Sequence, residues 1–199
     1  MTKLVLGSVA VGIGLGYAVL PDSFMAYTEY IIVIGLSVLL FLIGMDIGKA
    51  GTVVANFKKA GLKIMVFPAA NIVGTFAGAL VGSLFISATA MEALTVGAGF
   101  SWYSLAPLMI EPVSAEVAAM SFMHNVMREL AGIILIPVVA KKLGYIETTA
   151  LPGAAAMDVC IPIVERTTSP DVAVYSFVMG VVLSVAVPTF VPIFMGFIG

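Results

Sequence analysis

Long hydrophobic runs recur along the chain and are separated by short polar connections. Five of these runs have few charges, and they cover residues 4–20, 30–47, 62–86, 117–139 and 172–198. A helix that crosses the hydrocarbon core of a bilayer, about 30 Å thick, needs about 20 apolar residues. Because lipid offers no partner for backbone N–H and C=O groups, each run predicts a transmembrane helix.

Two further apolar runs are interrupted. Residues 93–110 contain GAGFSWYSLAP, and residues 150–165 contain PGAAAMDVCIP. Both stretches mix glycine, proline and polar side chains, and the second is short for a crossing. Non-helical backbone at membrane depth is stable only where protein or water surrounds it. We therefore expect two re-entrant loops, which enter the membrane and return to the same side.

The positions of the charges predict the orientation of the chain. Residues 48–63 carry four lysines, and Lys141 and Lys142 follow the run at 117–139. By the positive-inside rule both places are cytoplasmic. The run at 62–86 then leads from the cytoplasm to the outside, where the acidic connection near Glu92 lies. An odd number of crossings must separate Glu92 outside from Lys141 inside. Since the run at 117–139 crosses, the run at 93–110 must return to the outside. The run at 150–165 returns to the cytoplasm, and the C-terminus lies outside.

Residues 93–139 and 150–198 resemble one another at an offset of 55 positions. The matched pairs are Pro107 and Pro162, Glu116 and Asp171, Val117 and Val172, Ala118 and Ala173, Ser121 and Ser176, Phe122 and Phe177, and Pro137 and Pro192. Each unit is one re-entrant loop followed by one crossing, so the two copies have opposite orientations. Inverted repeats of this kind are typical of secondary transporters. Chance resemblance between apolar sequences is the alternative.

Composition agrees with a membrane protein. The 199 residues are 61% hydrophobic and 10% charged, and the mean hydropathy is +1.17, far above that of soluble domains. We expect an all-α polytopic membrane protein, with about five transmembrane helices and the two loops in a single transporter domain over residues 1–199. A signal peptide at residues 1–20 is the alternative for the first run. We expect no enzymatic activity, no cofactor, no metal and no nucleic-acid partner.

Ionisable residues inside the hydrophobic runs are candidates for function, because each costs roughly 2.5 to 3.5 kcal/mol on insertion scales. His124, Asn125, Arg128 and Glu129 lie near the middle of one predicted span, and Asp158 lies in the second loop. On a helix, Glu129 points about 100° away from Arg128. Because the inverted repeat would bring the two interrupted runs together at the middle of the membrane, Glu129 and Asp158 are predicted to face one aqueous cavity. An ion-pair network with Arg128 that only fixes helix packing is the alternative.

Three other side chains have two possible roles each. For His124, packing or hydrogen bonding competes with proton relay. Trp102 and Tyr103 in the first loop are either aromatic residues at the membrane interface or a wall that holds an ammonium group through cation–π contact. Asn125 and Arg128 are also candidates for lining a substrate site.

Four stretches resemble the LysO family of bacterial L-lysine exporters. They are GAGFSWYSLAPLMIEP, NVMRELAGIILIP, GAAAMDVCIPIVERT and LLFLIGMDIG. The resemblance implies export of L-lysine and its toxic analogues across the cytoplasmic membrane, with an intramembrane acidic pair on Glu129 and Asp158. Many members of the family carry additional spans before the matched region. The resemblance therefore also implies a split transporter, with a small N-terminal-type partner subunit or a homo-oligomer.

We expect an L-lysine exporter, or its core subunit, in a bacterial or archaeal cytoplasmic membrane. Export of a cation from a negative-inside cell runs against roughly 2.3 kcal/mol per 100 mV, and exchange for an external proton cancels that cost. The substrate ammonium and the proton would occupy the same carboxylates in turn, by alternating access. Two alternatives are a carboxylate-type symporter for an anionic substrate, which needs a base at the site, and a scaffold subunit without transport.

Overall fold

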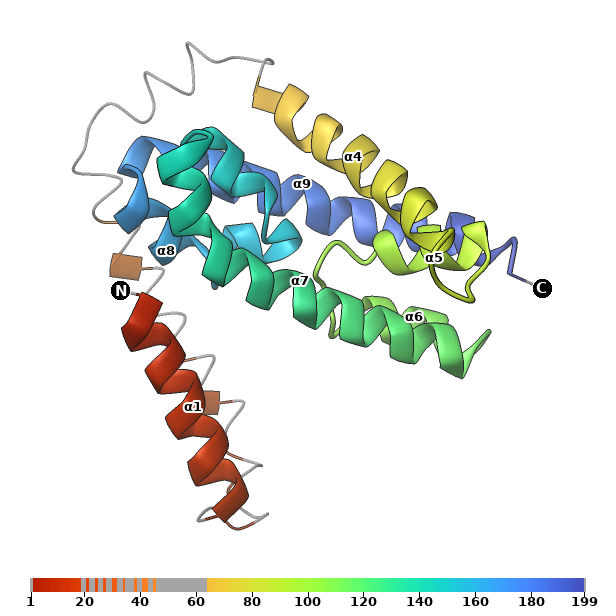
Figure 1. The fold of residues 1–199 in the computed structure, drawn as a ribbon, viewed down its shortest axis with the longest axis horizontal. Coiled ribbons are helices and arrows are strands. Elements are labelled where there is room, and N and C mark those ends of the chain that lie inside the picture. Colours follow the sequence, from red (N-terminus) through yellow and green to blue (C-terminus); the bar gives the residue numbers. More distant parts are fainter. Residues whose placement is uncertain are drawn as a thin grey trace. The chain divides into compact units, whose positions relative to one another are not determined.

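The computed structural model describes residues 2–18 and 64–198, with ten scattered positions between residues 21 and 45 (Figure 1). The chain divides into two compact units, Met1–Asp46 and Ile47–Gly199. In the first unit, helix α1 spans Thr2–Ala18 and matches the first predicted crossing. The second predicted crossing, at 30–47, lies largely outside the described residues.

The second unit is helical, with no strand among its described residues. Among the described residues of this unit, three helices are long and apolar enough to cross a membrane: α4 (Val66–Ser83), α7 (Ala115–Lys142) and α9 (Pro170–Met195). They match the predicted crossings at 62–86, 117–139 and 172–198, so these three predictions are confirmed as long apolar helices.

Both interrupted runs are broken helices. The first contains α5 (Ala90–Gly97) and α6 (Ala106–Ile110), joined by a turn. The second contains two 3-10 helices, η2 (Ile146–Ala150) and η3 (Gly153–Met157), and the short helix α8 (Ile161–Thr167). We call residues 98–105 the first break and residues 151–160 the second break. The interrupted helices agree with the sequence; their re-entry into a membrane stays a prediction.

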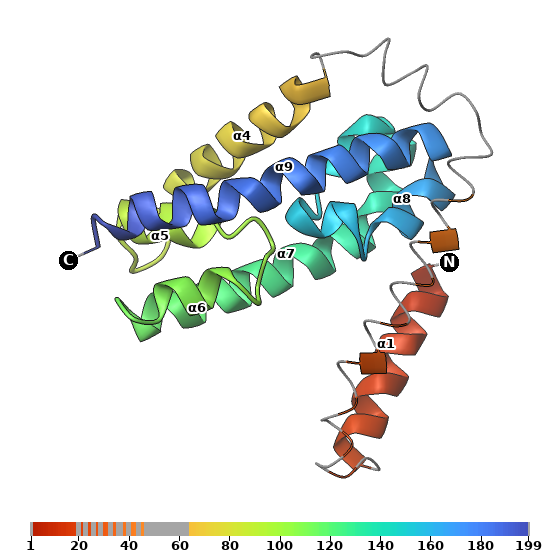
Figure 2. The same ribbon diagram turned by 180° about the vertical axis from the view of Figure 1, so that it is seen from behind.

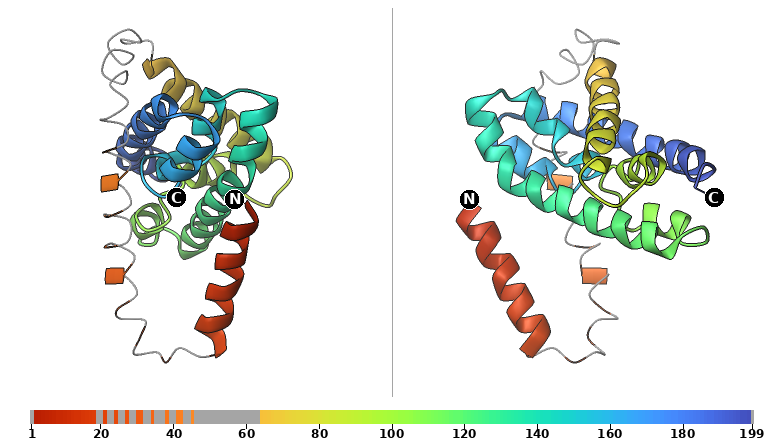
Figure 3. Two further views of the ribbon diagram at one scale, coloured as in Figure 1. Left: turned by 90° about the vertical axis from the view of Figure 1, so that its left-hand side faces the viewer. Right: turned by 45° about the vertical axis from the view of Figure 1, so that its right-hand side comes forward.

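Helices α7 and α9 run antiparallel, with the broken helices packed between and beside them (Figures 1 and 2). Helix α9 contacts η3, α5 and α8, and α7 contacts α5, α6 and α8. Helix α4 packs on α5 and α9, and it crosses α9 in the right-hand view of Figure 3. Buried Phe100, Ile110, Met179 and Leu183 form the centre of the main core. The breaks therefore lie in the middle of this unit.

The offset of 55 positions recurs in the structure. Ser114 caps α7 by accepting a hydrogen bond from the backbone N–H of Val117, and Ser169 caps α9 in the same way at Val172. Serine is a favoured cap because its hydroxyl satisfies an N–H that the helix leaves unpaired. Each long helix also follows a short one, α6 or α8, with proline near its start. The two halves thus share local structure as well as sequence.

Candidate functional site

The two breaks cross and are joined by their backbones. The N–H of Ala154 donates to the carbonyl oxygen of Phe100 at 2.6 Å. Phe100 and Ser101 have φ angles of 42° and 71°, a left-handed conformation that is uncommon outside glycine. Gly153 has a φ of 67°, and a Cβ atom there would overlap the Phe100 carbonyl. The contact between the two breaks therefore needs glycine at position 153 and a left-handed backbone at Phe100 and Ser101.

Asn125 holds the first break on α7. Its side-chain oxygen accepts from the N–H of Ser101 at 2.7 Å, and its amide nitrogen donates to the Ser121 hydroxyl at 3.1 Å. All three residues are buried. Because a buried backbone N–H must find an acceptor, Asn125 stabilises the left-handed turn at Ser101.

Ser176, the counterpart of Ser121, holds the second break on α9. Its hydroxyl donates to the carbonyl oxygen of Ala156 at 2.7 Å. A Cβ at Gly180 would overlap the backbone nitrogen of Met157, so the break lies directly against the helix. Each long helix thus fixes one break through a buried serine network.

Arg128 joins three elements and does not pair with the carboxylates. Its guanidinium donates to the side-chain oxygen of Asn71 at 2.9 Å and to the carbonyl oxygens of Leu151 and Ala150 at 3.3 and 3.5 Å. It also lies 5.8 Å from the centre of the Phe100 ring. Within residues 64–198, no carboxylate forms an ion pair with it, so the ion-pair network is not the arrangement observed here.

A pocket of about 110 Å³ lies between the two breaks, α7 and α9. It contains both candidate carboxylates, Glu129 and Asp158, and both candidate aromatic residues, Trp102 and Tyr103. The two carboxyl groups are half-buried. The N–H of Val159 donates to Asp158 at 2.5 Å, which fixes the direction of that side chain. The remaining lining residues are Ser101, Ser104, Ala154, Ala155, Met157, Val159 and Ser184.

The pocket is built from matched positions of the two halves. At the offset of 55, Trp102 corresponds to Met157, Tyr103 to Asp158, Ser104 to Val159 and Glu129 to Ser184, and all eight residues line it. Each half supplies one carboxylate, but from positions that do not match: Glu129 from a long helix and Asp158 from a break. The pocket therefore lies where the two halves meet, and its chemistry is asymmetric.

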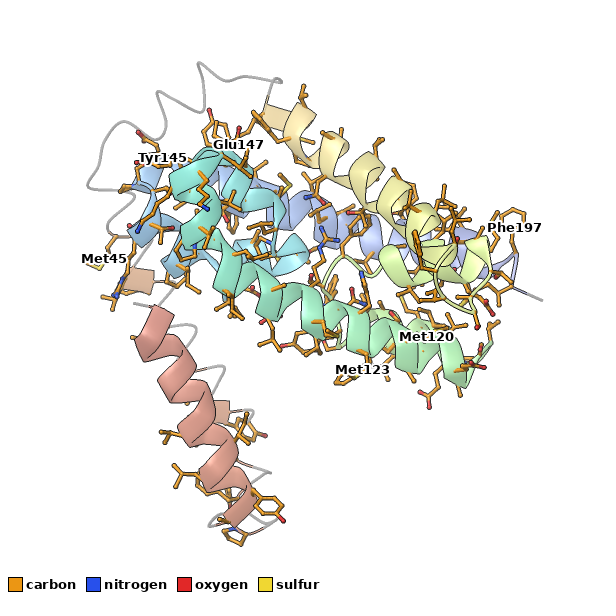
Figure 4. The ribbon with its side chains drawn as sticks, viewed as in Figure 1. Met45, Met120, Met123, Tyr145, Glu147 and Phe197 are labelled. Atoms are coloured by element: carbon orange, nitrogen blue, oxygen red, sulfur yellow. The ribbon has the colours of Figure 1, made fainter. Side chains whose placement is uncertain are left out.

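The other sequence candidates lie elsewhere. Asn125 is buried beside the first break, and exposed His124 and half-buried Arg128 line a separate groove of about 730 Å³ between α4, α5 and α7. Met120 and Met123, labelled in Figure 4, line the same groove. A third hollow of about 550 Å³ adjoins the end of α7, beside Tyr145 and Glu147 (Figure 4). Neither hollow contains the acidic pair.

Sequence reasoning missed Ser101, Met157 and Ser184 as pocket residues, and Asn71 as a partner of Arg128. Met157 and Ser184 lie 55 positions after Trp102 and Glu129, so the repeat itself contained the signal for them. No such signal exists for Asn71, whose contact with Arg128 depends on how α4 packs. Within the described residues, no three His, Cys, Asp or Glu side chains gather as metal ligands.

Comparison with known proteins places the chain in a family. The profile of the lysine exporter LysO family matches residues 6–195. The lysine exporter LysO of Escherichia coli strain K12 is 27% identical over 94% of this chain, and the chain spans 62% of its length. A putative lysine exporter of Haemophilus influenzae is 24% identical over 96% of this chain and 97% of its own length.

No solved structure shows a significant match. The profile covers nearly the whole chain, and its description as an exporter agrees with the long apolar helices of the structure, so the chain is a membrane protein. This chain belongs to the LysO family of lysine exporters.

Proposed function

We propose that this chain exports L-lysine, alone or as the core subunit of an exporter. The observation that carries the proposal is the pocket between the breaks, which contains Glu129 and Asp158 and no basic side chain. Two carboxylates without a basic partner favour a cation as ligand. The names of the two relatives agree with lysine as that cation.

Trp102 and Tyr103 support the same assignment. Both line the pocket beside the carboxylates. An aromatic face attracts an ammonium group and adds about 0.5 to 2 kcal/mol when the site is desolvated. An anionic substrate is not favoured, because Arg128 donates to Asn71 and to two carbonyl oxygens away from the pocket. We propose transport without chemical conversion of the substrate.

The transport cycle that we propose is alternating access between two inverted halves. The first break with α7 forms one half and the second break with α9 forms the other, and the pocket lies between them. In this scheme both breaks are re-entrant, the connection before α7 lies outside, and the connection before α9 lies in the cytoplasm. Transporters with inverted repeats bind substrate at such an interface, near the middle of the bilayer.

Proton exchange completes the proposal. Glu129 and Asp158 hold the lysine ammonium while ionised, and protons from outside replace the ammonium on the same oxygens. An inward proton offsets the cost of moving a positive charge outward, about 2.3 kcal/mol per 100 mV. In proteoliposomes that contain the purified chain, lysine taken up from outside should exchange for protons that leave the lumen, so the lumen should become more alkaline. Lysine flux without any change in luminal pH would exclude it.

The main test is removal of each carboxylate with its shape retained. Glu129→Gln and Asp158→Asn should each lower lysine export at least tenfold, because a charge-assisted contact with the substrate is lost. The matched control is Glu111→Gln, an exposed carboxylate at the end of α6. Export is measured as intracellular lysine in cells that lack their own exporter, with and without an N-terminal-type partner subunit. Full export by both variants would contradict the proposal and favour a scaffold.

Cysteine labelling tests the orientation. Val113→Cys, before α7, should react with an impermeant thiol reagent added outside intact cells. Thr168→Cys, before α9, should react only after the cytoplasm is made accessible. Labelling of both positions from the same side would exclude the inverted arrangement, while the lysine assignment would remain.

A further inference from the structure

Ser101 has a buried hydroxyl without a partner. The residue is 3% exposed, and its Oγ makes no hydrogen bond within the described part of the chain. Ser101 lies in the first break and lines the pocket that contains Glu129 and Asp158. An unpaired buried polar group costs about 1 to 3 kcal/mol, so such a group needs an explanation.

Other buried hydroxyl groups of the described residues are satisfied. Thr95, Thr148 and Thr149 donate to carbonyl oxygens one helical turn earlier. Ser176 donates to Ala156, and the hydroxyl of Ser121 accepts from Asn125. This fold therefore pairs buried hydroxyl groups where they serve structure alone. The exception at Ser101 coincides with the acidic pocket.

We propose that Ser101 Oγ is the third acceptor of a binding site for a primary ammonium group. A primary ammonium carries three N–H donors and no acceptor. Six of the lining residues carry a side-chain oxygen, and we assign the three donors to Glu129 on α7, Asp158 in the second break and Ser101 in the first break, because the Ser101 hydroxyl has no other partner in the described part of the chain. This inference rests on the proposed function and specifies which part of the substrate the pocket recognises.

The size of the pocket agrees with an ammonium head. Pockets that enclose a whole small molecule usually measure about 300 to 1,000 Å³, whereas this pocket measures about 110 Å³. A water molecule occupies about 30 Å³ in the liquid. The space is thus sufficient for an ammonium group with the first methylene groups attached to it. The rest of the substrate must extend out of the pocket.

The backbone that carries the hydroxyl is held in place before any ligand arrives. Asn125 fixes the backbone N–H of Ser101, and the adjacent carbonyl of Phe100 accepts from Ala154. The left-handed φ of 71° at Ser101 is therefore determined from both sides. A fixed acceptor loses little entropy on binding, which increases its contribution to affinity.

The geometry also predicts what the pocket rejects. A trimethylammonium group has the same charge as a primary ammonium but no N–H donor, so it satisfies none of the three acceptors. A guanidinium is a planar fork with five donors, which suits paired carboxylate oxygens rather than three separate groups. We expect the pocket to prefer primary ammonium groups to both.

The test is lysine binding to the purified full-length chain by titration calorimetry, with Ser101→Gly as the main variant. Glycine removes the hydroxyl and accepts the left-handed backbone, so the fold should be retained. Ser101→Ala is the second variant, and thermal unfolding reports on the fold of both. Ser83→Gly is the matched control, because the Ser83 hydroxyl bonds to Leu80 within α4, away from the pocket. The probes are L-lysine, its Nα-trimethyl and Nε-trimethyl derivatives, n-butylammonium and n-butyltrimethylammonium.

We expect Ser101→Gly to weaken lysine and n-butylammonium binding about tenfold or more, and Ser83→Gly to leave both unchanged. Ser101→Gly should not weaken n-butyltrimethylammonium binding, because this probe has no N–H to donate. Of the two trimethyl derivatives of lysine, the one whose methylated end enters the pocket should also be unaffected by Ser101→Gly. Comparing the two derivatives thus identifies which ammonium of lysine the pocket binds. Equal binding of n-butylammonium by Ser101→Gly and the unchanged chain would overturn the inference. If n-butylammonium shows the effect but lysine does not bind, the site stands and the proposed lysine function fails.

Discussion

The half formed by residues 90–142 and the half formed by residues 146–195 share a frame but differ at the pocket. Both begin their long helix at a serine cap, Ser114 or Ser169, and both bury a serine seven positions later. The caps and buried serines support the breaks. The positions that line the pocket differ between the halves: the first half has Tyr103 where the second half has Asp158. The repeated residues are thus structural, and the unmatched ones are candidates for function.

The halves also support their breaks differently. At matched positions α7 has Asn125, which reaches the first break through its side chain, and α9 has Gly180, which lets the second break approach its backbone. At this matched position the first half uses a side-chain hydrogen bond, whereas the second half uses direct packing of the break on the helix backbone. The position that matches Ser101 in the second half is Ala156, so only the first half has a hydroxyl there.

The largest effect is expected where the two halves touch. Gly153→Ala adds a Cβ that overlaps the Phe100 carbonyl and forces alanine to a φ of 67°. We expect a loss of about 2 to 5 kcal/mol in the free energy of unfolding. Thermal unfolding in detergent measures it. Gly74→Ala is the control, because its Cβ would meet no atom within 4 Å. Equal unfolding temperatures for both variants would show that Gly153 and Phe100 are not in tight contact.

The next effect concerns the side chain that only the first half uses. Asn125→Ala leaves the N–H of Ser101 buried without its acceptor, and Ser121 loses its donor. We expect destabilisation by about 1 to 3 kcal/mol. Hydrogen exchange should increase at Ser101 more than at Ala154 in the second break. An equal increase in hydrogen exchange in both breaks would contradict the inference that Asn125 supports the first break alone.

The direct packing in the second half predicts a smaller loss. Gly180→Ala should force Met157 away from α9, since its backbone nitrogen lies within contact of the added Cβ. Overpacking costs about 1 to 3 kcal/mol, and the better helix propensity of alanine returns about 1 kcal/mol. A net loss of up to about 2 kcal/mol in the free energy of unfolding is expected, with reduced lysine binding because Met157 lines the pocket. A stabilised variant would exclude the close approach.

The smallest effect should be the same in both halves. Ser114→Ala and Ser169→Ala each remove one helix cap, with an expected cost of about 1 kcal/mol. Because the two caps have the same geometry, the two variants should unfold at similar temperatures. A large difference between the two unfolding temperatures would show that the two caps contribute unequally to stability.

The sequence predicted the long helices well because each buries its polar backbone within itself. It also placed both interruptions, since proline and glycine mark them, and the offset of 55 identified the halves. Glu129 and Asp158 were predicted to share a cavity, and they line one pocket. Their roles with substrate and protons stay predictions.

Contacts between distant segments could not be predicted from the sequence. The bond from Arg128 to Asn71 depends on where α4 packs. The left-handed φ at Phe100 and Ser101 gave no signal either, because neither residue is glycine. Non-glycine residues in this conformation depend on surrounding structure, here Asn125 and Ala154, which periodicity does not describe.

The buried cysteine has a practical consequence for testing the proposed transport cycle. Cys160 is the single cysteine of the chain, and its thiol lies at the start of α8, 0% exposed, inside the second break. An engineered cysteine on the surface can therefore be labelled without first replacing a reactive native thiol. If the second break separates from α9 during the proposed cycle, the same thiol should become accessible, so reaction of Cys160 with a thiol reagent in the presence of lysine would report that separation.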